Sequence, residues 1–194
     1  MNWMKKVAVA LVCLLPLDLQ AAKVETLQVK SPSMNKSIEV VVVSPDVAAT
    51  KACPVIYLLH GYGGNARTWV GIKPDLPKIA DEKGIFFVCP DGKNTWYWDS
   101  PLNADVRYET FISNELVKYV DSHYKTVADR KGRAITGLSM GGHGAMWNGL
   151  RHSDVFSAAG STSGGVDIRP FPKNWEMSVQ IGEKAKYPEN WEKY

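Results

Sequence analysis

One pentapeptide, Gly137-Leu138-Ser139-Met140-Gly141, constrains the fold of this chain more than any other feature. It ends a short apolar run at 134–138 and precedes the glycine-rich stretch 142–146, which can open a helix. A serine at a strained strand-to-helix turn exposes its hydroxyl, and such a turn closes only where the flanking residues lack bulk. The pattern therefore predicts Ser139 as a nucleophile. The alternative is an ordinary glycine-rich turn with an incidental serine.

Other short apolar runs predict a sheet around this turn. Residues 55–59, 85–88 and 134–138 are continuous apolar runs, which are typical of parallel strands covered on both faces, and 155–159 is a candidate fourth. Nearer the N-terminus, two segments rich in β-branched residues predict an antiparallel pair of edge strands. These segments are 26–29 and 38–43, separated by Ser31-Pro32-Ser33.

The clearest helical pattern lies between the second and third apolar runs. Its apolar positions recur at spacings of three and four and share one face: Ile112, Leu116, Tyr119 and Val120. The polar residues expected to face solvent are Ser113, Asn114 and Lys118. Strands that alternate with helices indicate an α/β fold. At 194 residues the chain is long enough for one such domain.

The first 22 residues predict a cleaved signal peptide. Lys5 and Lys6 supply a charged start, 7–15 an apolar stretch, and Gln20-Ala21-Ala22 a cleavage site, which leaves residues 23–194 as one domain in a secreted or periplasmic protein. A membrane anchor is the alternative, but the apolar run stops at Pro16, short of the ~20 residues that a spanning helix needs. A lipid anchor on Cys13 is a weaker alternative, because no small residue precedes it.

The charge argues against nucleic-acid binding, and the positions of the cysteines argue against a disulfide. A net charge of +3 without a basic cluster offers no positively charged surface to nucleic acid. Cys53 precedes one predicted strand and Cys89 ends another, so in parallel neighbouring strands they would lie ~15–20 Å apart, too far for a disulfide. We expect both to be buried thiols rather than metal ligands or redox centres.

A second glycine-rich pattern, His60-Gly61-Tyr62-Gly63-Gly64, follows the strand predicted at 55–59. Acyl transfer creates a negatively charged oxygen, which two preorganised backbone N–H groups stabilise. The amide of Met140, directly after the nucleophile, and that of Tyr62 are the candidates for this oxyanion hole. We expect His60 to hold the loop by hydrogen bonds rather than to take part in catalysis. The alternative is an ordinary glycine-rich turn.

These motifs together resemble the esterase D-like serine esterases of the α/β-hydrolase superfamily. The resemblance covers about residues 24 to 170 and is carried by the two glycine-rich patterns and by three further segments, Pro90-Asp91-Gly92, Trp96-Tyr97-Trp98-Asp99-Ser100 and Tyr108-Glu109-Thr110-Phe111. That group includes S-formylglutathione hydrolases, tributyrin esterases, mycolyltransferases, and the feruloyl and acetyl-xylan esterases of carbohydrate esterase family 1.

The resemblance implies a mostly parallel sheet with helices on both faces. It implies Ser139 as nucleophile, an oxyanion hole formed by Tyr62 and Met140, and a loop bearing Trp96 and Tyr97 at the border of the acyl pocket. It implies neither a metal nor an organic cofactor. Read alone, an aromatic cluster such as that at 96–98 more often packs in a core than binds a ligand.

The histidine and acid that would complete a catalytic triad are not recognisable. In this fold they follow the serine in the order acid, then histidine. Only His143, inside the predicted helix, and His152, at its end, follow Ser139, while His123 precedes it at another helix end. The resembling enzymes continue with two further strands before both groups. We therefore expect a C-terminally incomplete domain that lacks the last strands and is inactive as it stands, or else a degenerate member.

The leading hypothesis is an exported serine carboxylic ester hydrolase that acts through an acyl-serine. Its expected partner is a small-molecule or carbohydrate ester: a short-chain ester, or an acyl, feruloyl or acetyl ester of a polysaccharide. Export disfavours a glutathione thioester. Acyl transfer to an alcohol is an alternative that uses the same acyl-enzyme. A non-catalytic exported protein that binds such a ligand is the alternative from another class. After signal cleavage we expect no stable membrane anchor.

Overall fold

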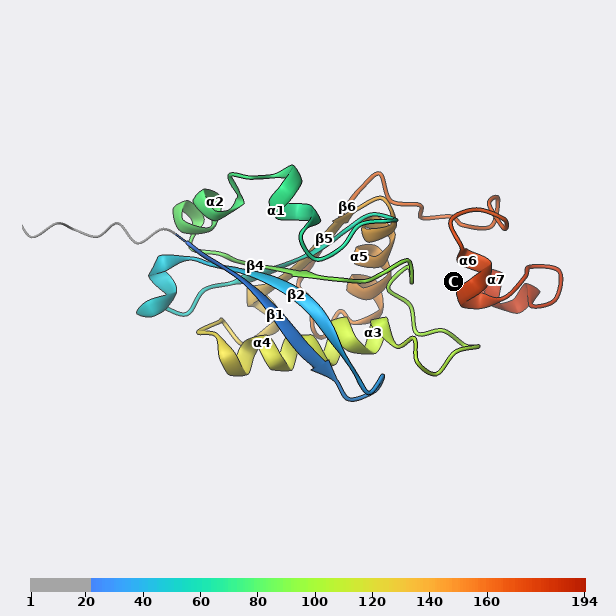
Figure 1. Cartoon of the computed structure of the whole chain (residues 1–194), viewed down its shortest axis with the longest axis horizontal. Helices are drawn as coiled ribbons and strands as arrows, with labels where there is room; N and C mark the ends of the chain where they lie inside the picture. The colour runs from blue at the N-terminus through green and yellow to red at the C-terminus, as the bar shows by residue number, and fades with distance from the viewer. Residues whose placement is uncertain (1–21) are drawn as a thin grey trace, which may run out of the picture.

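The computed structural model describes residues 22–194, which form a six-stranded sheet in the order β1-β2-β4-β3-β5-β6 (Figure 1). The predicted signal peptide, apart from Ala22, lies outside the described residues. Within residues 22–194, none of the helices has both the length and the apolar character needed to cross a membrane.

Four strands of this sheet are parallel, as the apolar runs predicted. They are β3 (Val55–Leu59), β4 (Phe86–Pro90), β5 (Arg133–Leu138) and β6 (Ala158–Thr162). The fourth strand begins later than the run at 155–159. The amides of Val155 and Phe156 both donate to the carbonyl of His152, so these two residues form a turn after the preceding helix. β6 lies at one edge of the sheet with its side chains mostly exposed, and further strands beyond it stay a prediction.

The antiparallel pair predicted near the N-terminus is present as β1 (Lys23–Ser31) and β2 (Lys36–Ser44). Of these two strands, only β1 lies at an edge of the sheet. The other side of β2 pairs with β4, so the expectation that both strands lie at the edge is wrong for β2. This pairing explains why residues 40–43 are all buried: alternate side chains enter the cores on the two faces of the sheet.

Helices cover both faces, as Figure 1 shows. α1 (Thr68–Ile72) and α2 (Leu76–Lys83) lie on one side. The other side is covered by a continuous helical segment made of α3 (Tyr108–Thr110), the π-helical η2 (Phe111–Leu116) and α4 (Val117–His123), and by α5 (Met140–Arg151). Short 3-10 turns occupy η1 (Asp46–Ala49) and η3 (Arg130–Gly132), and two short helices follow β6: α6 (Met177–Ile181) and α7 (Pro188–Lys193).

The predicted apolar helix face is confirmed, with one correction. Ile112, Leu116 and Val120 are fully buried. Ser113 was expected in solvent but is buried, and its hydroxyl donates to the Glu109 carbonyl at 2.7 Å. The π-helical turn changes the residue spacing there, which brings Ser113 inward with its polar group satisfied.

Cys53 and Cys89 are free and buried, as expected. They belong to the hydrophobic cores on opposite faces of the sheet. Burial raises the pKa of both thiols. Both cysteines therefore behave as small apolar core residues.

Candidate active site

Ser139 occupies the turn between β5 and α5 with φ 55° and ψ −118°. Its amide donates to the carbonyl of Thr162 at 2.8 Å, which ties the turn to the end of β6. A non-glycine residue at positive φ is strained, and such strain clusters at functional sites. The strand-turn-helix context that the motif requires is therefore present.

Close approach explains the two glycines that flank this turn. A Cβ on Gly137 would lie 2.2 Å from the carbonyl oxygen of Gly141. A Cβ on Gly141 would lie 2.2 Å from the carbonyl oxygen of Leu59, the last residue of β3. The two glycines thus bring the Ser139 turn against the start of the second glycine-rich loop.

A cavity of about 240 Å³ opens at Ser139. Its wall is rich in aromatic and aliphatic side chains, with few polar groups. The lining residues are Tyr62, Trp96, Ser139, Met140, Ser163, Gly165, Asp167, Ile168, Phe171, Trp175 and Met177. Among residues 22–194, no group of carboxylates, imidazoles and thiols converges as a metal ion would require.

Both candidate oxyanion donors lie at this cavity. Met140 is the first residue of α5, and Tyr62 lies on the loop after β3. Neither amide N–H is taken up by a hydrogen bond within the described residues. The two amides are thus available to a negatively charged oxygen bound near Ser139. The side chain of Tyr62 is a separate group: partial desolvation and the neighbouring Glu176 carboxylate raise the pKa of its phenol.

The loop that carries Tyr62 is fixed by hydrogen bonds from both sides. Gly63 has φ 75°, in the left-handed region, and its amide donates to Asn94 Oδ1 at 2.8 Å. His60 is buried: its Nδ1 lies 2.7 Å from the Gly61 carbonyl oxygen, and its Nε2 accepts from the Gly92 amide at 2.9 Å. His60 therefore holds the loop by hydrogen bonds, as expected, and it does not line the cavity at Ser139.

The carboxylate of Asp91 lies 3.5 Å from His60 Nε2 and 2.6 Å from Lys93 Nζ. Burial alone would raise its pKa, but the contacts with His60 and Lys93 outweigh burial and hold the pKa well below its usual range. The Asp91 carboxylate next to His60 is therefore ionised.

The two aromatic residues predicted to bind substrate have different positions. Trp96 lines the cavity, and its Nε1 donates to the Trp175 carbonyl at 3.1 Å. Tyr97 is fully buried and does not line the cavity, and its hydroxyl donates to the His60 carbonyl at 3.1 Å. The expectation for Tyr97 is therefore corrected to a supporting role beneath the loop.

Sequence reasoning missed the opposite wall of the cavity. Ile168, Phe171, Trp175 and Met177 come from the segment after β6, to which no role was given. The aromatic residues of this tail were its only signal.

The four histidines of the chain all have partners other than Ser139. His143 Nδ1 lies 2.6 Å from the Gly165 carbonyl oxygen, while its Nε2 accepts from Trp98 Nε1 at 2.9 Å. Burial lowers the pKa of His143, against the opposing effect of the Gly165 carbonyl. His152 Nε2 lies 2.9 Å from Glu109 Oε1. His60 lies beneath the loop, and His123 lies at the end of α4. Within the described residues, none of the four histidines forms a hydrogen bond with Ser139.

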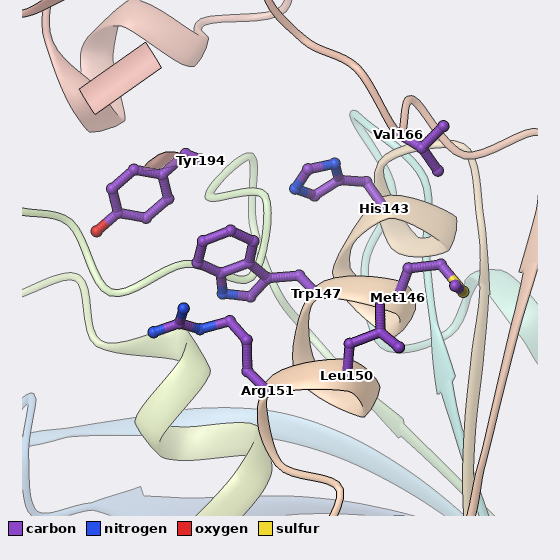
Figure 2. Close-up of a pocket in the computed structure, with 7 residues that line it drawn as sticks. All are labelled: His143, Met146, Trp147, Leu150, Arg151, Val166 and Tyr194. Carbon is purple, nitrogen blue, oxygen red and sulfur yellow. The ribbon is translucent and has the colours of Figure 1, made fainter. Parts of the chain in front are cut away.

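A second cavity, of about 400 Å³, lies on the outer surface of α5. Figure 2 shows α5 side chains pointing into it, with Tyr194 and Val166 at its border. The Trp147 and Tyr194 rings stack at 5.0 Å, and the Arg151 guanidinium lies 4.5 Å from the Trp147 ring centroid. Ser139 does not line this cavity, so it is separate from the candidate active site.

The comparisons with known proteins agree on one family. The sequence model of the family described as "Putative esterase" matches residues 31–194. Esterase Rv1288 of Mycobacterium tuberculosis (strain ATCC 25618 / H37Rv) is 30% identical over 149 residues, covering 73% of this chain and 32% of that protein. Diacylglycerol acyltransferase/mycolyltransferase Ag85A of Mycobacterium leprae (strain TN) is 33% identical over 158 residues, covering 74% and 44%.

A solved structure of a ferulic acid esterase has 30% sequence identity and a TM-score of 0.70, covering 88% of this chain and 69% of that chain. The fold is thus the α/β-hydrolase fold that the motifs implied. The chain spans about a third to a half of the length of these two curated relatives.

Proposed function

Since this chain belongs to the esterase family, we propose that it is a serine carboxylic ester hydrolase acting through an acyl-serine at Ser139. One observation carries the proposal. Ser139 lies at a strained strand-to-helix turn that opens into an apolar cavity, beside two backbone amides that have no hydrogen-bond partner within residues 22–194. A nucleophile, an acyl pocket and two oxyanion donors are the parts that acyl transfer requires.

In the proposed reaction, Ser139 Oγ attacks the ester carbonyl carbon and gives up its proton to a base. The carbonyl electrons move to oxygen, and the oxyanion accepts hydrogen bonds from the Tyr62 and Met140 amides, each worth roughly 3–4 kcal/mol. The carbonyl re-forms, the bond to the alcohol oxygen breaks, and the alcohol leaves with a proton. Water then attacks the acyl-serine by the same route and releases the acid.

The proposed substrates are short-chain esters, or acyl, feruloyl or acetyl esters of polysaccharides. A cavity of about 240 Å³ suits a small acyl group, and the rings of Trp96 and Trp175 offer flat apolar walls to an aromatic one. The likeness to a ferulic acid esterase supports the polysaccharide esters among these substrates.

Export is proposed from the N-terminal pattern. The test is the intact mass of the exported protein, which should show that residues 1–21 or 1–22 have been removed.

We further propose that these 194 residues alone turn over esters very slowly. Within residues 22–194, each of the four histidines has hydrogen-bond partners other than Ser139, so none of them is placed as the base that would activate it. Removing a triad base typically lowers rates by several orders of magnitude. An acyl group transferred to Ser139 should therefore persist, since its hydrolysis needs the same base.

The test is acylation by p-nitrophenyl butyrate, with and without added imidazole as a substitute base. We expect about one acyl group per protein on the peptide that contains Ser139, formed faster with imidazole and absent in Ser139→Ala. Ser122→Ala is the matched control, because Ser122 is exposed on α4, away from the cavity. Equal acylation of the parent and Ser139→Ala would contradict the proposal.

Two alternatives have their own outcomes in this experiment. The mycolyltransferase relative favours acyl transfer, in which an added alcohol would remove the acyl group from Ser139 faster than water does. In the part of the chain that the structure describes, no imidazole forms a hydrogen bond with Ser139, and this arrangement favours a non-catalytic binding protein. That function would give saturable binding of a carboxylic ester without any adduct, even with imidazole present.

A further inference from the structure

One peptide unit carries both the Gly61 carbonyl and the Tyr62 N–H. The described residues contain no cis peptide bonds, and in a trans peptide these two groups point in opposite directions. The Gly61 oxygen is held by His60 Nδ1 at 2.7 Å and by the Gly64 amide at 3.0 Å. Holding the carbonyl inward against His60 therefore turns the Tyr62 N–H the other way.

The proton position on His60 follows from its partners. Asp91 Oδ1 lies 3.5 Å from His60 Nε2, farther than the Gly92 amide nitrogen at 2.9 Å. The Gly92 amide can only donate a hydrogen bond, so Nε2 is its acceptor. The proton of the neutral ring is then on Nδ1, which donates it to the Gly61 oxygen. Both ring nitrogens of this buried side chain are thereby occupied.

We infer that His60 is a positioning residue that sets the orientation of the Gly61–Tyr62 peptide and so presents the Tyr62 amide as one half of the oxyanion hole. The inference rests on the proposed function. Glycines at 61, 63 and 64 leave the loop backbone free to adopt other conformations. In the flipped peptide, the Gly61 carbonyl would face the developing negative charge and repel it.

Apart from the backbone bond from the Gly64 amide to the Gly61 oxygen, the neighbouring contacts fix the rest of the loop rather than this peptide. The Gly63 amide is held by Asn94 Oδ1, and the His60 carbonyl is held by the Tyr97 hydroxyl. A Cβ on Gly64 would lie 2.8 Å from His60 Nδ1 and 3.0 Å from the Gly61 oxygen, so glycine leaves room for their contact. Of the side chains, His60 alone bonds to the Gly61–Tyr62 peptide within residues 22–194.

Two conservative variants separate the two bonds of His60. In His60→Asn, the side-chain amide reaches the place of Nδ1 and can still donate to the Gly61 oxygen. In His60→Gln, the side chain reaches the place of Nε2 and can still accept from the Gly92 amide. The inference predicts that His60→Asn keeps most of the rate of Ser139 acylation. We expect His60→Gln to lose about 100-fold, the typical loss for one oxyanion donor, with an unchanged half-saturating ester concentration.

A merely structural role gives a different pattern. It would lower the melting temperature of both variants while leaving their acylation rates similar, or it would raise the half-saturating concentration. Either result, or a faster His60→Gln than His60→Asn, would overturn the inference.

A direct measurement does not depend on turnover. Long-range 1H–15N NMR spectra of the parent protein at neutral pH should show His60 protonated on Nδ1 and bare at Nε2. The opposite tautomer, or a doubly protonated ring, would overturn the inference even if both variants failed to fold. Equal acylation of the parent and Ser139→Ala would instead overturn the proposed function, and it would leave the tautomer assignment of His60 unchanged.

Discussion

Trp96 and Trp175 join the two walls of the candidate acyl cavity: the Trp96 indole N–H donates to the Trp175 carbonyl at 3.1 Å, across 79 positions of the chain. Both residues have positive φ, 59° and 48°. Because strained non-glycine backbone persists only where its surroundings hold it, this bond is one of the contacts that fix the cavity wall.

Replacing Trp96 with Phe keeps a ring in the wall and removes the donor. We expect the half-saturating concentration of an aromatic acyl ester to rise about fivefold, the effect of one hydrogen bond of about 1 kcal/mol. The acetyl ester, which reaches less of the wall, should change less. The control is Trp69→Phe, because the buried Trp69 Nε1 has no partner within the described residues. Equal effects on both esters would contradict this role of Trp96.

Gly63 tests the backbone of the oxyanion loop. A Cβ placed there meets no atom within 4 Å, so the cost of Gly63→Val comes from its φ of 75° alone. We expect a much lower acylation rate with a nearly unchanged half-saturating ester concentration, since the oxyanion contact strengthens in the transition state. Gly71→Val, with equally open space and no positive φ, is the matched control. An unchanged rate for Gly63→Val would remove the loop from the mechanism.

Tyr97→Phe tests the supporting role of Tyr97. The variant leaves the buried His60 carbonyl without its hydroxyl donor, which should lower the free energy of unfolding by about 1–3 kcal/mol. The half-saturating ester concentration should stay unchanged, because Tyr97 does not line the cavity. Denaturant unfolding and ester titration measure the two effects, and a higher half-saturating concentration at unchanged stability would return Tyr97 to the binding site.

Local patterns predicted most of the sheet, and their failures have physical causes. The apolar run at 155–159 could not reveal that Val155 and Phe156 close a turn on His152, because turn residues that pack into the core look like a strand. The position of β2 inside the sheet depends on pairing with β4, more than forty residues later. Ser113 turned inward because a π-helical turn altered the spacing.

The candidate site also contains residues that the sequence predicts and residues that it does not. Ser139 and the Tyr62 loop carry their glycine requirements in adjacent residues, so a motif could find them. Trp175 reaches the cavity only through the path of the tail after β6. Trp96 and Tyr97 are neighbours with similar φ, 59° and 60°, and no periodic rule says which of the two faces the cavity.

Glu109 links the segment that precedes α4 to α5. Its Oε1 accepts hydrogen bonds from Arg151 Nε at 2.9 Å and lies 2.9 Å from His152 Nε2, and its Oε2 accepts from Trp147 Nε1 at 2.7 Å. Burial alone would raise its pKa, but the bonds from Arg151, Trp147 and His152 outweigh burial and lower it. The carboxylate is therefore more strongly bound in its ionised form.

This direction predicts how the stability conferred by Glu109 depends on pH. A carboxyl group whose pKa is lower in the folded state stabilises the fold above its unfolded pKa, about 4.3 for Glu, and loses that effect as pH falls through the folded value. Glu109→Gln should thus be less stable than the parent by about 1–3 kcal/mol near neutral pH, and the gap should narrow below about pH 4. Urea unfolding at a series of pH values measures it. Glu82→Gln, on an exposed pair with Lys78, should show a gap below about 1 kcal/mol throughout. A gap for Glu109→Gln that stays constant down to acid pH would mean that shape, rather than charge, makes Glu109 important.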